Sequence, residues 1–172
     1  MVDVRVWRHF RAVLLAPVLM AVVVPLAIWL TAGLRQVEVP AAGRWLALAV
    51  GGALVSAGVA LFLWTNVLFD REGKGTLAIF DPPRRLVVRG PYRHVRNPMI
   101  TSVIAVLFGE AVMTRSSWLM LWSLTFLGVN MLFMPLFEEP GLVRRFGEDY
   151  MRYRANVPRW LPRVRPWSGP SD

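Results

Sequence analysis

The sequence predicts an all-α polytopic membrane protein, and three observations lead to that prediction. Hydrophobic residues make up 55% of the 172-residue chain, above the roughly 45–50% that is usual in soluble domains. They gather in four apolar stretches, of which three reach the roughly 20 residues that span a bilayer and one, residues 99–113, is shorter and carries Glu110. Basic residues fill the segments between them. The four predicted transmembrane helices, within a single membrane domain of residues 1–172, cover residues 12–34, 45–69, 99–113 and 117–137.

The basic residues divide unequally between the two sides of such a bundle. With both termini on one side, seventeen arginines and lysines lie on that side and three lie on the other. Cytoplasmic loops carry the excess of positive charge, so we expect both termini in the cytosol. Arginine- and proline-rich usage with a single lysine is typical of a high-GC bacterium, which predicts the bacterial inner membrane. A cleaved signal peptide is disfavoured, because the run 12–34 exceeds the roughly 7–15 residues of such a core.

Short patterns predict how the helices meet. Only "TRS", residues 114–116, separates the last two helices, which indicates a tight C-terminal helical hairpin. Gly52, Ser56 and Ala60 recur every four residues, a spacing that lets helix backbones approach closely. Three prolines inside apolar runs are expected to kink their helices: Pro17, Pro25 and Pro135.

Two polar segments are predicted to form the cytosolic, cofactor-binding part: residues 70–98, a basic loop, and residues 138–172. The second reads as an amphipathic helix followed by an end broken by prolines. Its apolar residues fall at helical spacing among arginines, a pattern that suits an anionic membrane surface. These apolar residues are Leu142, Phe146, Tyr150 and Tyr153.

Composition excludes several kinds of site. The chain has no cysteine, so it has no disulfide or zinc–thiolate site. Its two histidines are far apart in sequence, and we predict no metal. The net charge of +9 is explained by membrane orientation, and no nucleic-acid partner is expected.

The stretch "GPYRHVRNPMI", residues 90–100, predicts an anion site at the start of the third membrane helix. Asn is a favoured N-cap and Pro a favoured first helical residue, so Asn97 and Pro98 are expected to begin that helix. Its unpaired N–H groups then attract an anion, with Arg96 beside them and Arg93 and His94 close by.

The end of the fourth helix predicts the opposite charge. "FEEP" places Glu138 and Glu139 at a helix C-terminus, where a negative charge needs a cationic partner. Glu138 is expected above Met134 at i, i+4 spacing. The tight hairpin makes the two sites neighbours, and a zwitterion such as an amino acid would satisfy both. The alternative is a direct ion pair between Arg96 or Arg93 and Glu138 or Glu139.

The second half of the chain resembles the integral-membrane methyltransferases, which include isoprenylcysteine carboxyl methyltransferases and phospholipid N-methyltransferases. The family pattern is G-x-Y-x-x-x-R-H-P-x-Y-x-G, a hydrophobic stretch and then Glu-Glu. "FGEDYMRYRANVP" is similar to a phrase of the isoprenylcysteine enzymes, whereas "NPM" and "EEP" look like the phospholipid enzymes. Three positions depart from the pattern: Asn97 for His, Ile100 for Tyr and Ser102 for Gly.

The resemblance implies S-adenosylmethionine as cofactor. Arg96, Asn97 and Pro98 would hold its carboxylate region, and Glu138 and Glu139 its ammonium. Tyr92 is a candidate to pack on the cofactor or to lie in an interfacial aromatic belt. The wider set of candidate cofactor-binding residues is Tyr92, Arg93, His94, Arg96, Asn97, Pro98, Glu138 and Glu139; His94, Arg96 and Asn97 are candidates for a catalytic role.

The resemblance further implies methyl transfer to a lipophilic acceptor at the cytosolic interface. A prenylcysteine-like carboxylate, a phospholipid amine and another small hydrophobic molecule all remain open as the acceptor. Two other functions also stay open: a membrane reductase of related fold, and a non-catalytic protein that binds anionic lipid. The sequence carries no sign of an oligomeric state.

Overall fold

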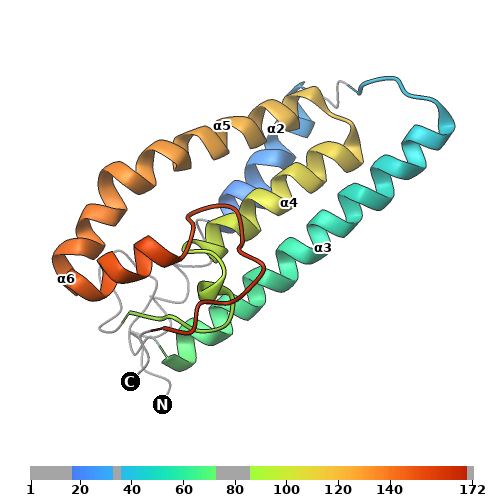
Figure 1. Ribbon diagram of the computed structural model, residues 1–172. Helices are drawn as coiled ribbons and strands as arrows, with labels where there is room; N and C mark the ends of the chain where they lie inside the picture. Colours follow the sequence, from blue (N-terminus) through green and yellow to red (C-terminus); the bar gives the residue numbers. More distant parts are fainter. Residues whose placement is uncertain (1–16, 33–35, 73–85, 170–172) are drawn as a thin grey trace, which may run out of the picture.

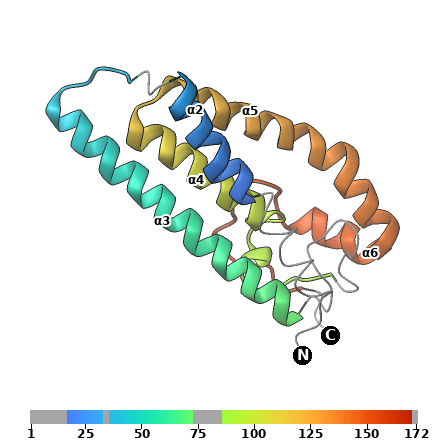
Figure 2. The ribbon, with the colours of Figure 1, turned by 180° about the vertical axis from the view of Figure 1, so that it is seen from behind.

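The computed structural model describes residues 17–32, 36–72 and 86–169, and within them it is helical without strands. One isolated bridge pairs Gln36 with Ser116. Figures 1 and 2 show α3 alongside α4, while α5 leads away from them to α6, which turns back. The elements are η1 (Leu19–Val23), α2 (Val24–Ala32), α3 (Ala41–Glu72), η2 (Gly90–Arg93), α4 (Pro98–Thr114), α5 (Ser117–Phe133), η3 (Met134–Glu138) and α6 (Glu139–Asn156).

Two of the four predicted spans form helices long and apolar enough to cross a membrane. One is Ala41–Leu68, and the other begins the helical run Ser117–Asn156, which is kinked at Gly147, where φ is 54°. The stretches Leu19–Ala32 and Pro98–Thr114 are shorter apolar helices, and about four transmembrane crossings stay a prediction. α3 also continues to Glu72, so the expected loop start at residue 70 was wrong by three residues. Residues 73–85 of the basic loop lie outside the described part.

Glycines hold α3 against α4 at backbone distance. A Cβ built on Gly51 would lie 2.6 Å from the carbonyl oxygen of Gly109, and one on Gly58 would lie 2.8 Å from that of Ser102. The predicted stripe of Gly52, Ser56 and Ala60 does not make this contact: nothing lies within 4 Å of a Cβ at Gly52, and the other two side chains are exposed. Because adjacent helix positions differ by 100°, the four-residue pattern was assigned to the wrong face.

The α4–α5 hairpin forms as predicted. Arg115 adopts the left-handed conformation, with φ of 56°, and its N–H donates to carbonyls of the last α4 turn. Ser116 then caps α5 by accepting from the N–H of Leu119 at 3.3 Å. Arg115 also donates to Gln36 at 3.1 Å, which fixes the hairpin tip to the segment before α3.

Two π-helical turns coincide with prolines inside the apolar runs. η1 ends just before Pro25, and η3 contains Pro135. In η3 the N–H of Glu139 donates to the carbonyl of Met134, five residues back. Buried Met134 is therefore followed on the same face by buried Glu139, while Glu138 is exposed. The expected stacking of Glu138 over Met134 was wrong, because a π turn adds one residue to the helical repeat.

The glycine contacts predict unequal effects of two adjacent substitutions. Gly51→Ala should lower the free energy of unfolding by about 1–3 kcal/mol, because its methyl group would overlap the α4 backbone. Gly52→Ala is the matched control, since its methyl group meets open space. Denaturant unfolding of the detergent-solubilised protein, followed by tryptophan fluorescence, measures both. Equal stabilities of the two variants would contradict this helix packing.

Candidate functional site

The N-terminus of α4 lacks a side-chain cap. α4 begins at Pro98 with Asn97 at the N-cap position, as predicted, but the Asn97 side chain makes no capping hydrogen bond. The Asn97 carbonyl accepts from both the N–H and the Oγ1 of Thr101, each at 2.9 Å. The first-turn N–H groups of a helix lack intrahelical partners. The Asn97 amide and these N–H groups are thus available to an acceptor outside the helix.

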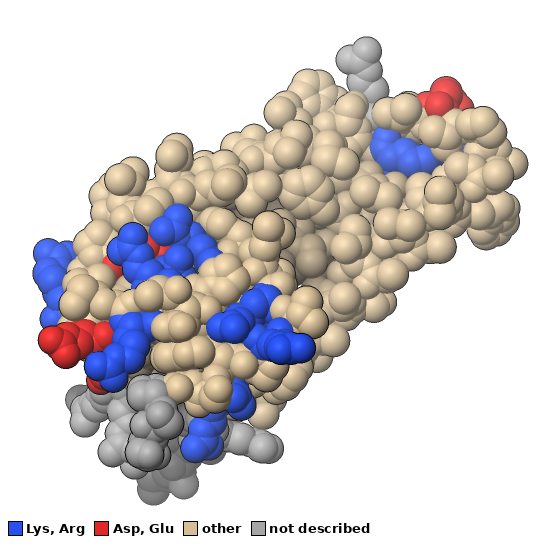
Figure 3. Space-filling view, viewed as in Figure 1, with Lys and Arg blue, Asp and Glu red and all other residues tan. Residues whose placement is uncertain are grey.

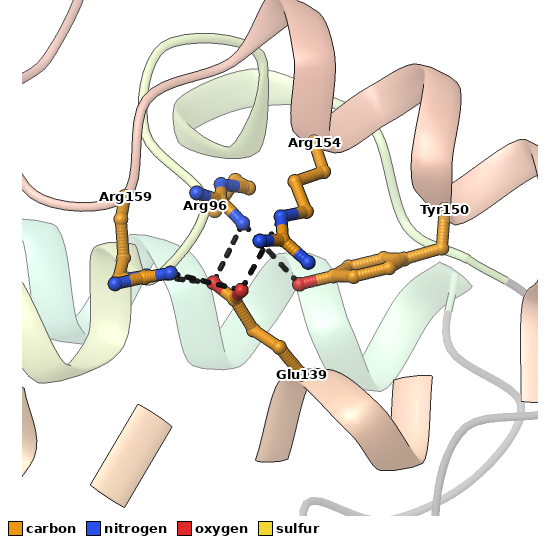
Figure 4. Close-up of polar contacts among 5 residues, drawn as sticks. All are labelled: Arg96, Glu139, Tyr150, Arg154 and Arg159. Carbon is orange, nitrogen blue, oxygen red and sulfur yellow. Dashed lines mark hydrogen bonds and ion pairs between the residues drawn. The ribbon is translucent and has the colours of Figure 1, made fainter. Parts of the chain in front are cut away.

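A buried carboxylate lies beside this helix start and contacts three guanidinium groups (Figure 4). Glu139 Oε1 accepts from Arg96 Nη1 and from Arg159 Nε, each at 2.6 Å. Its Oε2 accepts from Arg159 Nη2 at 2.9 Å and forms an ion pair with Arg154 Nε at 3.5 Å. Arg96 Nη1 also lies 3.5 Å from the Tyr150 hydroxyl oxygen. Both oxygens of Glu139 are therefore occupied by arginines.

The cluster is buried, so its charges must be paired within the protein. The side chains of Arg96 and Glu139 are only 9% and 4% exposed, and isolated charges at such sites are strongly disfavoured. The Arg96–Glu139 ion pair is the alternative that the sequence left open. One group remains unsatisfied: Arg96 Nε is buried with no hydrogen-bond partner among the described residues. Buried N–H donors nearly always have a hydrogen-bond acceptor, and the described residues supply none for Arg96 Nε.

The residues before α4 are held by the C-terminal segment 157–167, here called the strap. Main-chain hydrogen bonds run from Arg96 N–H to Pro158 O at 2.9 Å and from Arg163 N–H to His94 O at 3.0 Å. Arg93 Nε donates to Trp167 O, and Trp167 N–H returns a bond to Arg93 O at 2.9 Å. The guanidinium of Arg93, expected near the anion site, thus holds the strap.

His94 is oriented by the same contact. Its Nδ1 lies 2.7 Å from the carbonyl oxygen of Arg163. A carbonyl only accepts hydrogen bonds, so Nδ1 carries the hydrogen and donates it. In the neutral ring Nε2 is then the acceptor nitrogen, and it is the atom of His94 left for proton chemistry.

Tyr92 is hydrogen-bonded to α6 and lies near Glu138. Its carbonyl accepts from the Tyr153 hydroxyl at 2.7 Å. Burial of the phenol, and after it the nearby Glu138 carboxylate, raise the pKa of Tyr92 above its ordinary value. The phenol therefore keeps its proton and stays a hydrogen-bond donor near Glu138.

Glu138 differs from Glu139 in exposure and in hydrogen bonding. Its side chain is exposed, and it makes no hydrogen bond or ion pair with any other described residue. The two adjacent acids thus have separate places: Glu139 lies inside the arginine cluster, and Glu138 lies outside it with a free carboxylate.

The apolar face of α6 is covered by the chain itself. Tyr150, Tyr153 and Val157 form a buried cluster, and the rings of Tyr153 and Trp167 lie 5.8 Å apart. The partly buried residues that pack on this cluster are Leu86, Val88, Leu142, Val143, Phe146 and Trp167. The proline-broken end forms as predicted, whereas the predicted amphipathic helix is kinked at Gly147, and its apolar face packs inside the protein.

Sequence reasoning missed Arg154 and Arg159 as partners of Glu139. Their contact joins residues 15 and 20 positions apart across a helix and an irregular segment, which no short-range spacing reveals. The available signal was the pair of acids next to a tail rich in arginine: a buried acid in that setting needs cations from somewhere.

The fold and the site define a helical protein with two helices long and apolar enough to cross a membrane, and with an arginine–glutamate cluster at one end of its apolar helices. The sequence profile of the phospholipid methyltransferase family matches residues 46–149, more than half of the chain, and the chain belongs to this family. No curated protein matches the chain. The predicted relationship to integral-membrane methyltransferases is thus confirmed, and membership implies a methyltransferase that acts on lipid.

The cluster predicts a large difference between the two adjacent acids. Glu139→Gln should lower the free energy of unfolding by about 3–5 kcal/mol, because it leaves the buried guanidinium of Arg96 without its counter-charge. Glu138→Gln is the matched control and should change it by no more than about 0.5 kcal/mol. Denaturant unfolding followed by tryptophan fluorescence measures both. A Glu139→Gln protein as stable as wild type would show that the cluster does not hold the fold.

Proposed function

We propose that this protein transfers a methyl group from S-adenosylmethionine to a lipophilic acceptor at the cytosolic membrane interface, with a phospholipid amine as the first acceptor to test. Family membership supports the reaction class. The observation that carries the proposal is the buried, unpartnered Nε of Arg96 beside the uncapped start of α4.

These residues fit the carboxylate of the cofactor's methionyl group. Arg96 Nε, the Asn97 amide and the first N–H groups of α4 are all donors that lack partners in the described chain. A carboxylate accepts several hydrogen bonds and is favoured at a helix N-terminus. Asn97 offers an amide donor where relatives of the isoprenylcysteine type have a histidine, so the substitution is compatible with the role.

The cofactor's ammonium is assigned to Glu138. The oxygens of Glu139 already accept from Arg96 and Arg159, which leaves the exposed carboxylate of its neighbour to meet a cation. Glu139 then orients Arg96 and does not itself contact the cofactor. The protonated phenol of Tyr92 near Glu138 adds a donor at the same end.

The bound sulfonium supplies an electrophilic methyl group. The chain must hold the acceptor in line with it and exclude water. A lipid amine must also lose a proton before it attacks. Nε2 of His94 is the group proposed to accept that proton, because Nδ1 is committed to Arg163 O. A carboxylate acceptor would need no base, so the two acceptor classes differ in their dependence on His94.

The cofactor assignment predicts a clear difference in a binding measurement. Calorimetry with S-adenosylhomocysteine should give heat for the wild-type protein, and Glu138→Gln should weaken binding about tenfold or more, because hydrogen bonds to charged groups contribute about 1.5–3 kcal/mol. Glu148→Gln, a change to an exposed acid on α6, is the control and should bind as the wild type does. No heat from the folded wild-type protein would overturn the methyltransferase proposal.

The acceptor class is tested by methyl transfer into defined lipids. Purified protein with methyl-labelled S-adenosylmethionine should label phosphatidylethanolamine and not a prenylcysteine. His94→Ala should lower that rate while Glu139→Asp, which keeps the charge, retains part of it. Label in the prenylcysteine alone, with no effect of His94→Ala on the rate, would replace the amine by a carboxylate as acceptor.

A further inference from the structure

The strap exposes two apolar side chains that nothing in the described chain covers. Leu161 is 81% exposed and Val164 is 95% exposed, more than any other large hydrophobic residue recorded as exposed. Elsewhere such residues lie mainly on the long apolar helices, where lipid tails would cover them. The strap has no regular secondary structure, so its exposed apolar residues need a separate explanation.

The strap cannot easily turn these side chains inward. It is attached at Pro158, Arg163 and Trp167 by main-chain hydrogen bonds to residues 93–96. Val157 before it is 1% exposed, and Trp167 at its end packs on Tyr153. The strap is therefore fixed on both sides of Leu161 and Val164, and it holds these two side chains on the protein surface.

The position of the strap relative to the helices places it at the depth of a membrane interface. Arg96, bonded to Pro158 in the strap, lies two residues before the start of α4. Gly90, in the segment that leads to Arg96, lies close to the end of the apolar span in α3. A Cβ built on Gly90 would be 3.3 Å from the side chain of Leu68, the last residue of that span. The strap therefore lies where the apolar helices end, which in a bilayer is the headgroup region.

Charge indicates the kind of lipid. Residues 150–169 contain five arginines and no acidic residue. Arg152 and Arg165 are exposed, whereas Arg159 is committed to Glu139 and Arg163 donates to Asn156 O at 2.7 Å. Figure 3 shows basic side chains gathered at this end and few along the helices. A second copy of the chain would bring like charges together, so the surface suits an apolar and anionic partner.

We propose that the strap is an interfacial membrane contact, in which Leu161 and Val164 enter the headgroup region of a leaflet containing anionic phospholipid. Arg152 and Arg165 are placed to bind the phosphate-bearing headgroups, since each basic residue near such a surface adds attraction. Apolar insertion and charge attraction together are the two requirements for stable interfacial binding. The contact does not depend on the methyl-transfer proposal.

The cysteine-free chain allows a direct measurement of depth. Full-length Leu161→Cys and Val164→Cys proteins, each carrying one nitroxide, are reconstituted into vesicles of phosphatidylcholine alone or mixed with phosphatidylglycerol. Electron paramagnetic resonance then compares collision with oxygen, which concentrates in the bilayer, against collision with a water-soluble nickel complex. Glu148→Cys, at an exposed acidic position on α6, is the water-facing reference.

We expect both strap labels to favour oxygen in the mixed vesicles, while the Glu148 label favours nickel in both. Val164→Asp in the labelled Leu161→Cys protein should move that label toward water, with helical circular dichroism unchanged. Strap labels as accessible to nickel as the reference would overturn the proposal. So would equal insertion without anionic lipid, or spin–spin broadening that reveals a second copy. Calorimetry with S-adenosylhomocysteine on the same samples separates failure of this contact from failure of the cofactor site.

Discussion

The buried carboxylate of Glu139 is the constraint on which the rest of the site depends. It begins α6, yet its partners come from the residue before the Asn97 N-cap, from the end of α6 and from the strap. Because a charge so deeply buried must be paired, these segments have to meet at one point. Their meeting fixes Arg96 beside the start of α4 and leaves its Nε without a partner. The hydrogen bonds that Arg159 donates to Glu139 also raise the pKa of Arg159, so that guanidinium stays charged.

One local irregularity separates the roles of two adjacent acids. The π turn of η3 carries the buried face from Met134 to Glu139 and turns Glu138 outward. Glu139 can therefore bind arginines while Glu138 stays free for a ligand of positive charge. π turns are often found at functional sites, and Pro135 inside this one explains why the regular hydrogen-bond pattern gives way here.

Local sequence signals predicted much of this arrangement. Apolar run lengths predicted the four apolar helices, and "TRS" and "NP" predicted the ends of the hairpin and the start of α4. The sequence also predicted acids close to Arg96, but it placed them at a helix C-terminus, whereas Glu139 lies in the first turn of α6 and the chain stays helical there. The sequence did not reveal the π turn, which buries Glu139 and leaves Glu138 exposed. It also did not reveal the close contact between Gly51 and Gly109. The strap contacts were missed because they join residues about 60 to 75 positions apart, and such pairing leaves no periodic trace.

In the proposed site, the two charged ends of the cofactor's amino-acid group are held by different residues, Arg96 and Glu138. Binding of S-adenosylhomocysteine compared with its deaminated analogue, in wild-type and Glu138→Gln proteins, tests it most directly. Loss of the amino group should weaken binding to the wild type about tenfold or more, and Glu138→Gln should no longer distinguish the two ligands. Equal discrimination by both proteins would contradict the assignment of Glu138 to the ammonium.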